Sequence, residues 1–566
     1  MEEFFQLFKT PWEMYCPGRN YDVVIADGEH IPRCQAKLLL IYGASSKPTD
    51  QRSLFVPREP SPHQIVANGE KLPIYGDLLT FEDAPEAACC LTLDSRKAGF
   101  RIRSSSTTLT RVGYDLFEEV RILLSLGQPV EQASIPTLDI HIKMLRNWIL
   151  GEGIPLVEVP PVPAGHSHIV CLSHDIDFVG IRNHKFDHTM WGFLYRSTIG
   201  SIRNWFRRRI SLIQVLRSWW AVASLPFVYL GWIKDFWEPF EWYLEAEKGL
   251  PSTYFLIPFP GRAGVKVPGP YPSRRAAAYD LDDLAPSITL LKAARCELGV
   301  HGIDSWNDVD KGRTELAKLQ AVSGESTVGI RMHWLLQDSN TMTALERSGY
   351  AYDSTSGYNE TIGYRNGTTQ VFRPLGVTRL LEVPLHIQDG ALFYPQRLDL
   401  SESQASIRCR SMIDKAVEYG GVLTILWHDR SHGPERFWGD FYVGLVGSLR
   451  SSSGWFATTR QAADWFRKRR EAHFEGFDDS MPQIRLQRRP NQVEPSLTVR
   501  FHFPKTRANC PGQDATSDSI DIKWDGESNV ELDRWLRAVS ERSTLEHSNA
   551  PNISMDCIKK PASSLP

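Results

Sequence analysis

The stretch IVCLSHDIDF, residues 169–178, determines how the middle of this chain folds. Its first four residues are apolar, and His174, Asp175 and Asp177 follow them. A short apolar run of this kind is typical of a strand buried on both faces of a parallel sheet. Because side chains alternate along a strand, Asp175 and Asp177 are expected on the same side. Two carboxylates held that close repel unless a cation or a proton lies between them, although two acids after a strand also fit a helix N-cap or a turn.

Polar residues follow other predicted strands at the same point. Strands are predicted at 168–172, 253–257, 297–300, 328–330, 380–385 and 422–427, and helices are predicted between them, the clearest at 402–419. His301 follows one strand, Arg331 and His333 follow another, and His428 follows the last. A single histidine is more often structural than a ligand. Four strand ends that deliver such residues together are hard to explain by packing, because the carboxyl ends of parallel barrel strands share the face where active sites are built.

These residue types suit one kind of chemistry. Histidine and carboxylate together bind divalent transition metals such as zinc, with cobalt or nickel as further candidates. An open coordination position would hold a water that becomes nucleophilic near neutral pH. A second carboxylate can accept the proton of that water, and a histidine opposite can protonate the leaving group. An arginine beside the base would orient it and keep it ionised.

The order and spacing of these residues resemble the polysaccharide deacetylase superfamily, the carbohydrate esterase group with the NodB homology domain. The resemblance covers about residues 166–465. SHDID resembles the first motif of the family, CELGVHGIDSW the second, GIRMHW the third, LEVPLHIQD at 381–389 the fourth region and LTILWH the fifth. It implies a distorted (β/α) barrel of about seven strands and a divalent metal cofactor.

The resemblance also implies a role for each matched residue. Asp175 would be the catalytic base, Arg331 would position it, and His428 would be the general acid. Asp177 and His301 would be metal ligands. Asp389 is the candidate supporting residue in the fourth region.

Two departures from the family pattern concern the metal. The second motif usually has another histidine four residues after the first, where this chain has Ser305. The third motif usually has a proline two residues after its arginine, where this chain has His333. Because Arg331 and His333 share a side of the strand, we expect His333 to supply the missing nitrogen. His174 and Asp304 are the alternative ligands.

The chain of 566 residues is long enough for two or three domains. Residues 1–165 are predicted to form a smaller N-terminal α/β domain, with a strand at 36–43, a helix capped by Asp115 and a second helix at 137–150. A Pro-rich linker at 155–165 precedes the barrel at 166–475. A C-terminal extension at 476–566 is predicted to contain two short strands, at 496–503 and 519–524, and to be disordered over its last twenty residues.

One insert at 190–245 is crowded with aromatic residues and arginines. Helices packed over the barrel mouth are one interpretation. An amphipathic segment that makes peripheral contact with a membrane surface is a second, since basic and aromatic residues suit that interface. Binding of a protein partner is a third.

The net charge and the cysteine pattern limit the possible partners and the cellular compartment of the protein. The net charge of −3 gives no field that would favour nucleic acid. The nine cysteines form no CxxC pair, so we interpret them as reduced thiols in a cytoplasmic protein. The N-terminus lacks the pattern of a signal peptide, and no apolar run is long enough to predict a spanning helix.

The sequence therefore predicts a metal-dependent hydrolase that cleaves a non-peptide carbon–nitrogen bond, most simply the N-acetyl group of an amino sugar. The expected partner is a carbohydrate, either a small N-acetylated sugar or a lipid-linked glycan. Two alternatives stay open. One is a degenerate barrel that binds a glycan or a protein without turnover, and the other is an amide hydrolase that acts on non-sugar substrates.

Overall fold

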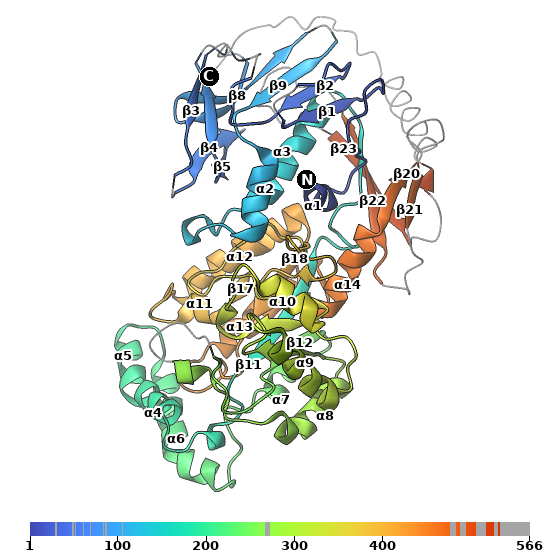
Figure 1. Ribbon diagram of the computed structural model, residues 1–566. Coiled ribbons are helices and arrows are strands. Elements are labelled where there is room, and N and C mark those ends of the chain that lie inside the picture. Colours follow the sequence, from blue (N-terminus) through green and yellow to red (C-terminus); the bar gives the residue numbers. More distant parts are fainter. Residues whose placement is uncertain are drawn as a thin grey trace, which may run out of the picture.

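The computed structural model describes residues 1–475, apart from 29–30, 48–49, 51, 60, 68, 83, 85–87, 105 and 266–271, together with 483–486, 494–504, 517–525 and 530–531. Figure 1 shows an N-terminal sheet, a central region of strands and helices, and a group of helices (α4 to α6) beside that region. None of the helices in these ranges is both long and apolar enough to cross a membrane. The disorder expected for the last twenty residues lies outside the described ranges.

The central region is a curled sheet in which every strand pair is parallel. The strands lie in the order β16 (Leu381–Glu382), β15 (Tyr352–Asp353), β14 (Ile330–Met332), β13 (Glu297–Gly302), β12 (Ser252–Leu256), β11 (Ile169–Ile176), β18 (Val422–Leu426) and β17 (Ile387–Gln388), with β19 (Trp455–Phe456) also paired to β11. All eight residues of β11 are buried, as its apolar run predicts. The predicted distorted (β/α) barrel is confirmed.

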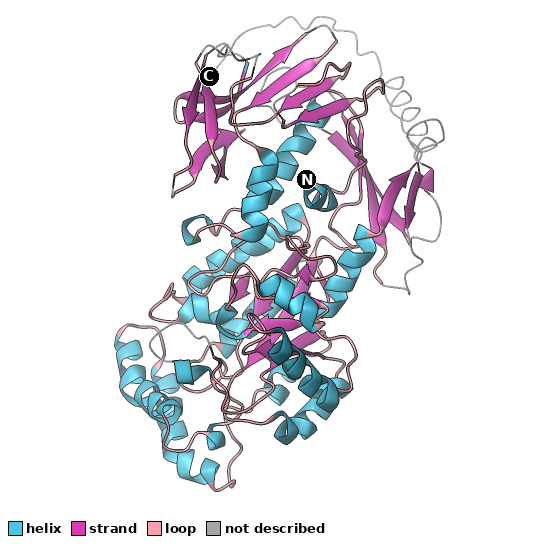
Figure 2. Cartoon of the chain, in the orientation of Figure 1, coloured by secondary structure: helices cyan, strands magenta, loops and turns pink. Residues whose placement is uncertain are grey.

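Helices alternate with these strands and cover the sheet (Figure 2). They are α7 (Phe240–Ala246), α8 (Ala285–Ala293), α9 (Val309–Ser323), α10 (Thr341–Ser348), α11 (Asp389–Phe393), α12 (Glu402–Tyr419), α13 (Gly439–Arg450) and α14 (Thr459–Arg470). Helix α12 has the predicted bounds, because a Ser401–Gln404 capping box begins it and Gly420, at a φ of 77°, ends it. Of the strand predicted at 380–385, only Leu381 and Glu382 form a strand, β16, and β17 lies beyond that range. Strand β14 begins at the residue where the predicted strand 328–330 ends.

The N-terminal part is a mixed seven-stranded sheet with three helices. Its strands lie in the order β1 (Val23–Ala26), β2 (Leu38–Ile41), β9 (Thr108–Val112), β8 (Arg96–Arg103), β7 (Cys89–Leu93), β4 (His63–Ala67) and β5 (Glu70–Ile74), beside a ribbon of β3 (Ser53–Val56) and β6 (Leu78–Phe81). The helices are α1 (Glu2–Leu7), α2 (Leu116–Ser125) and α3 (Thr137–Gly151). Asp115 caps α2 as predicted, accepting from the amides of Phe117 and Glu118.

One buried carboxylate of helix α3 contacts the barrel. Asp139 accepts hydrogen bonds from the Thr368 hydroxyl at 2.7 Å and from the Thr369 amide at 2.8 Å. Burial raises the pKa of Asp139 to about 6, although these hydrogen bonds lower it. Thr368 and Thr369 lie in the segment between β15 and β16, which therefore also supports the N-terminal helices.

The segment predicted to be a Pro-rich linker contains a strand. Strand β10 (Leu156–Glu158) pairs antiparallel with β22 (Leu497–Pro504), which pairs with β23 (Ser517–Trp524). The prolines at 155 and 160 only flank this strand, so they do not remove its ladder hydrogen bonds. The remaining small sheet contains β20 (Ala472–Glu475), β21 (Gln483–Leu486) and β24 (Val530–Glu531).

The aromatic insert is helical. It contains α4 (His188–Tyr195), a π-helical turn (Arg196–Gly200), α5 (Ser201–Phe206) and α6 (Leu212–Tyr229). A small apolar cluster that includes Phe193, Leu225 and Trp237 holds these helices together. The hydroxyl of Ser218 donates to the carbonyl of Pro434, so the insert packs against the loop that follows β18.

Candidate metal centre and active site

The predicted site residues come from neighbouring strands of the curled sheet. Asp175 lies in β11, and Asp177 follows that strand. His301 in β13 is paired in register with Arg331 in β14, so their side chains lie next to each other on the sheet. His333 begins the turn after β14, where Trp334 has a left-handed φ of 63°. The structure therefore brings these residues from separate parts of the sequence to one end of the sheet.

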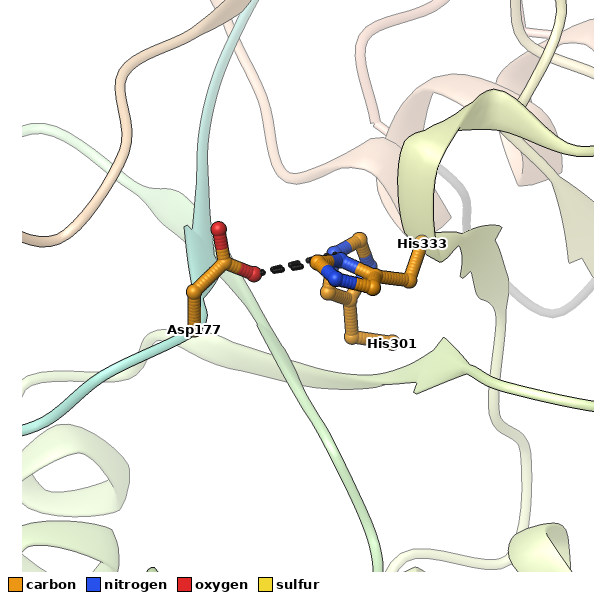
Figure 3. A group of neighbouring side chains, drawn as sticks. All are labelled: Asp177, His301 and His333. Atoms are coloured by element: carbon orange, nitrogen blue, oxygen red, sulfur yellow. Dashed lines mark hydrogen bonds and ion pairs between the residues drawn. The ribbon is translucent and has the colours of Figure 1, made fainter. Parts of the chain in front are cut away.

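Three of these residues form a cluster whose ligand atoms face one another (Figure 3). His301 Nε2 lies 2.8 Å from His333 Nδ1. Asp177 Oδ1 lies 3.4 Å from His301 Nε2 and 3.2 Å from His333 Nδ1. Ligand atoms bound to a tetrahedral zinc at about 2.0–2.1 Å lie roughly 3.3 Å apart, so the three atoms match one face of such a site.

The protonation of the cluster also suits a cation. His301 Nδ1 lies 2.9 Å from the carbonyl oxygen of Arg331, which fixes the proton on Nδ1 and leaves a lone pair on Nε2. Burial lowers the pKa of His333 to about 4, so its imidazole is neutral near pH 7. Asp177 Oδ1 is buried and accepts no hydrogen bond within the described residues. A buried carboxylate oxygen without a donor is costly, and a metal ion would remove that cost.

The candidate base is held by a fully bonded arginine. Arg331 Nη1 donates to Asp175 Oδ1 at 3.0 Å and to the Ser173 hydroxyl at 2.9 Å. Its Nε and Nη2 donate to the carbonyl and the hydroxyl of Ser354, both at 3.0 Å. The guanidinium also lies 4.5 Å above the ring of Phe255. The other oxygen of Asp175, Oδ2, lies 3.7 Å from His301 Nε2, so the carboxylate faces the metal cluster.

Two buried carboxylates behind Arg331 do not compete for its charge. Burial raises the pKa of Asp353 to about 6 and raises that of Glu382 well above its usual range. The neighbouring Asp353 adds to the raised pKa of Glu382. Asp175 is the acid that Arg331 contacts directly.

The candidate general acid is held by the fourth-region aspartate. His428 Nδ1 lies 2.5 Å from Asp389 Oδ1, and the His428 amide donates to Asp389 Oδ2 at 2.9 Å. Burial lowers the pKa of His428, but Asp389 and, more weakly, Asp177 and Asp175 outweigh it and raise that pKa to about 10. The side chain is 21% exposed, so a protonated imidazole is accessible to a bound ligand.

Two of the predicted supporting residues lie outside the cluster. His174 points to the other side of β11, where its Nε2 lies 2.7 Å from Glu247 and its Nδ1 lies 2.9 Å from the Trp427 carbonyl. Asp304 accepts from the Val265 amide at 2.9 Å and from Lys311 at 3.0 Å, and it lines a separate pocket of about 390 Å³. Neither residue contributes a ligand atom to the group of three.

Ser305 stands four residues after His301, where the second motif of the family that the sequence resembles usually has a histidine. In this chain Ser305 forms structural hydrogen bonds. Ser305 donates to Glu315 at 2.6 Å and its hydroxyl lies 3.0 Å from that of Tyr350. These hydrogen bonds join the loop after β13 to helix α9. Because residue 305 is a serine bonded to Glu315 and Tyr350, no imidazole lies at this position. The second nitrogen of the cluster comes from His333, directly after the next strand, β14.

Sequence reasoning missed three hydroxyls that hold the site, those of Ser173, Ser354 and Ser431. Ser173 is two residues before Asp175 and shares its side of β11, so strand alternation alone could have identified it. Ser354 comes from the end of β15, and nothing local in its sequence indicates that it bonds Arg331. Ser431 also donates to Asp389, beside its contact with His428.

Comparison with solved structures finds proteins that are similar to about half of this chain. A probable polysaccharide deacetylase from Pseudomonas aeruginosa PAO1 is 14% identical, with a TM-score of 0.33, over 55% of this chain and 95% of that one. The Puue allantoinase is 14% identical, with a TM-score of 0.32, over 53% of this chain and 91% of that one. No protein-family model and no curated protein match the chain. The barrel assignment stands on the strand order and register of the chain itself.

Proposed function

We propose that this protein is a metal-dependent hydrolase that removes an N-acetyl group from an amino sugar. The observation that carries the proposal is the convergence of three parts at one end of the sheet. These parts are the Asp177–His301–His333 cluster, the Asp175–Arg331 pair and the His428–Asp389 pair. Together they supply metal ligands, a base and an acid, which are the groups that amide hydrolysis by an activated water requires.

The chain's own residues would perform the proton transfers. A divalent ion such as zinc, held by Asp177, His301 and His333, would supply an acidified water and polarise the acyl carbonyl. Asp175 would accept the proton of the attacking water, since Arg331 keeps it oriented toward the cluster. His428, charged because of Asp389, would donate a proton to the amine nitrogen as the C–N bond breaks. The products would be acetate and a free amino sugar.

The test of this function is acetate release from N-acetylated mono- and oligosaccharides after loading with zinc. Asp175→Asn is expected to reduce kcat by about 10²–10⁴-fold, which is the usual contribution of a positioned base. Asp304→Asn is the matched control, because that carboxylate lies outside the cluster, and it is expected to retain activity. Unchanged turnover in Asp175→Asn, under conditions where the wild type is active, would exclude this mechanism.

We also propose that the insert 190–245 binds an anionic membrane surface. Between Asp187 and Asp235 the chain has six arginines and no acidic residue. Large apolar side chains of the same insert are exposed: Phe206 is 74% exposed, Trp220 71% and Trp232 73%. Exposed apolar and aromatic residues interspersed with arginines fit the headgroup region of a bilayer that carries negative lipids.

Membrane binding can be measured by sedimentation with vesicles. The full chain is expected to bind vesicles that contain phosphatidylglycerol and to bind neutral phosphatidylcholine vesicles weakly. Each arginine near an anionic surface contributes about 1 kcal/mol, so the Arg207→Gln/Arg208→Gln variant should bind at least about tenfold more weakly. Self-association with no vesicle binding would show that the exposed face joins copies of the chain instead.

A further inference from the structure

Three arginines gather beside the candidate general acid and are not part of the mechanism above. Arg430 is two residues after His428, and its guanidinium carbon lies 3.7 Å from the ring centre of Phe178, the residue that follows Asp177. Arg436 lies 5.1 Å above the ring of Tyr394. Arg196 comes from the π-helical turn of the insert, and burial together with Arg430 and Arg436 lowers its pKa to about 10. We call these three residues the arginine cluster.

None of the three guanidiniums donates a hydrogen bond to any residue that the structure describes. Nε and Nη2 of Arg196 and Nε of Arg436 are buried as well as unbonded, and Arg436 as a whole is only 8% exposed. Buried charged donors without acceptors are costly, because they lose water and gain nothing in return. Such an arrangement indicates that a ligand supplies the acceptors.

The nearby carboxylates do not fill this role. Glu435 lies 3.9 Å from Arg436 Nε, beyond hydrogen-bond distance, and its other oxygen accepts from the indole of Trp237. Asp429 accepts from the backbone amides of Phe178 and Val179. Burial raises the pKa of Tyr394, yet Arg436 and Arg430 outweigh it and lower that pKa below its usual value.

We propose that the arginine cluster is a subsite for a phosphate or diphosphate group of the substrate. One guanidinium can bond both oxygens of a single carboxylate, as Arg470 does with Glu3. Three unbonded guanidiniums offer more donors and more charge than a carboxylate can use, and the planar donor fork of arginine matches phosphate oxygens. The inference rests on the proposed function and narrows its substrate to N-acetylated amino sugars that carry a phosphate ester.

Pyrophosphate is the probe for this subsite, with its binding measured calorimetrically on the full chain after removal of metal by dialysis against a chelator. Without metal, the probe cannot bind through the Asp177–His301–His333 cluster. Arg430→Gln and Arg196→Gln are each expected to weaken binding at least about tenfold, since charge-assisted hydrogen bonds are lost. Arg262→Gln is the matched control, because Arg262 also stacks on an aromatic ring, Phe259, and lies outside the cluster. It should bind as the wild type does.

The outcomes separate the subsite from the proposed reaction. Pyrophosphate binding that survives Asp175→Asn but weakens in Arg430→Gln supports the subsite, even if no acetate release is found. Equal affinity of Arg430→Gln and Arg262→Gln, with both variants folded by circular dichroism, would overturn it, as would the absence of pyrophosphate binding to the wild type. Turnover of a nucleoside diphosphate sugar, compared with that of a lipid-linked sugar diphosphate in detergent, then identifies the source of the phosphate.

Discussion

Arg331 and the arginine cluster differ in how their guanidiniums are hydrogen-bonded. Arg331 is completely buried, and its Nε, Nη1 and Nη2 all donate hydrogen bonds to Ser173, Asp175 or Ser354. The three guanidiniums of the arginine cluster donate none within the described residues. A fully bonded guanidinium fixes its neighbours in place. A guanidinium without such bonds keeps its N–H donors available for a bound molecule, and its unpaired burial lowers the stability of the chain.

The largest expected effect of this difference is on catalysis. Arg331→Lys keeps the charge but cannot bond Asp175, Ser173 and Ser354 together, because an ammonium lacks the planar fork. The base would lose its orientation, and kcat should fall about 10²–10³-fold with little change in metal content. Acetate release and elemental analysis on the same preparation measure both quantities. Wild-type kcat in this variant would mean that Asp175 needs no positioning residue.

The second expected effect is on the free energy of unfolding. Substitution of Arg331 should lower it, whereas substitution of Arg196 should leave it unchanged or raise it. Arg331→Met leaves Asp175 buried without its partner, so the free energy of unfolding should fall by about 3–5 kcal/mol. Arg196→Met removes a buried charge that nothing in the described chain compensates, so the same quantity should stay unchanged or rise by about 1 kcal/mol. Urea unfolding of both variants measures the difference. Equal losses would show that the arginine cluster is a structural element and not a ligand site.

A smaller effect concerns the pH dependence set by the His428–Asp389 pair. Asp389 holds the pKa of His428 at about 10, above its ordinary value, so the imidazole stays charged until the pH rises through that range. Asp389→Asn removes the attraction, so the alkaline limb of kcat/KM should move at least about one pH unit toward neutral. Asp304→Asn provides the comparison profile. An alkaline limb that does not move would mean that His428 is not the acid.

Much of the site could be predicted because strand ends are local features. Apolar runs that end in Asp, His or Arg identify the strands and place the polar residues at one face, and alternation puts Asp175 with Asp177 and Arg331 with His333. The sequence alone does not decide whether His333, His174 or Asp304 completes the set of metal ligands. His333 was one of three candidates, and only the register between β13 and β14 brings its Nδ1 within 2.8 Å of His301.

Other features depend on contacts between distant segments and leave no local pattern. Ser354 reaches Arg331 from another strand. The Pro-rich segment at 155–165 reads as a linker because the strand that pairs with β10 lies more than 300 residues away, at β22. The arginine cluster combines Arg196 of the insert with the loop after β18, so neither segment indicates an anion site when it is read alone.

The most direct test of the account is the metal content of the purified protein after loading with zinc and dialysis without chelator. The wild type should hold about one ion per chain, and His333→Ala should lose it, because a site of three protein ligands would keep only two. His386→Ala is the matched control, since His386 is equally buried and belongs to another part of the barrel. Loss of the ion in His333→Ala alone is the predicted result. An ion retained in His333→Ala, or none in the wild type even with cobalt or nickel, would contradict the proposed centre.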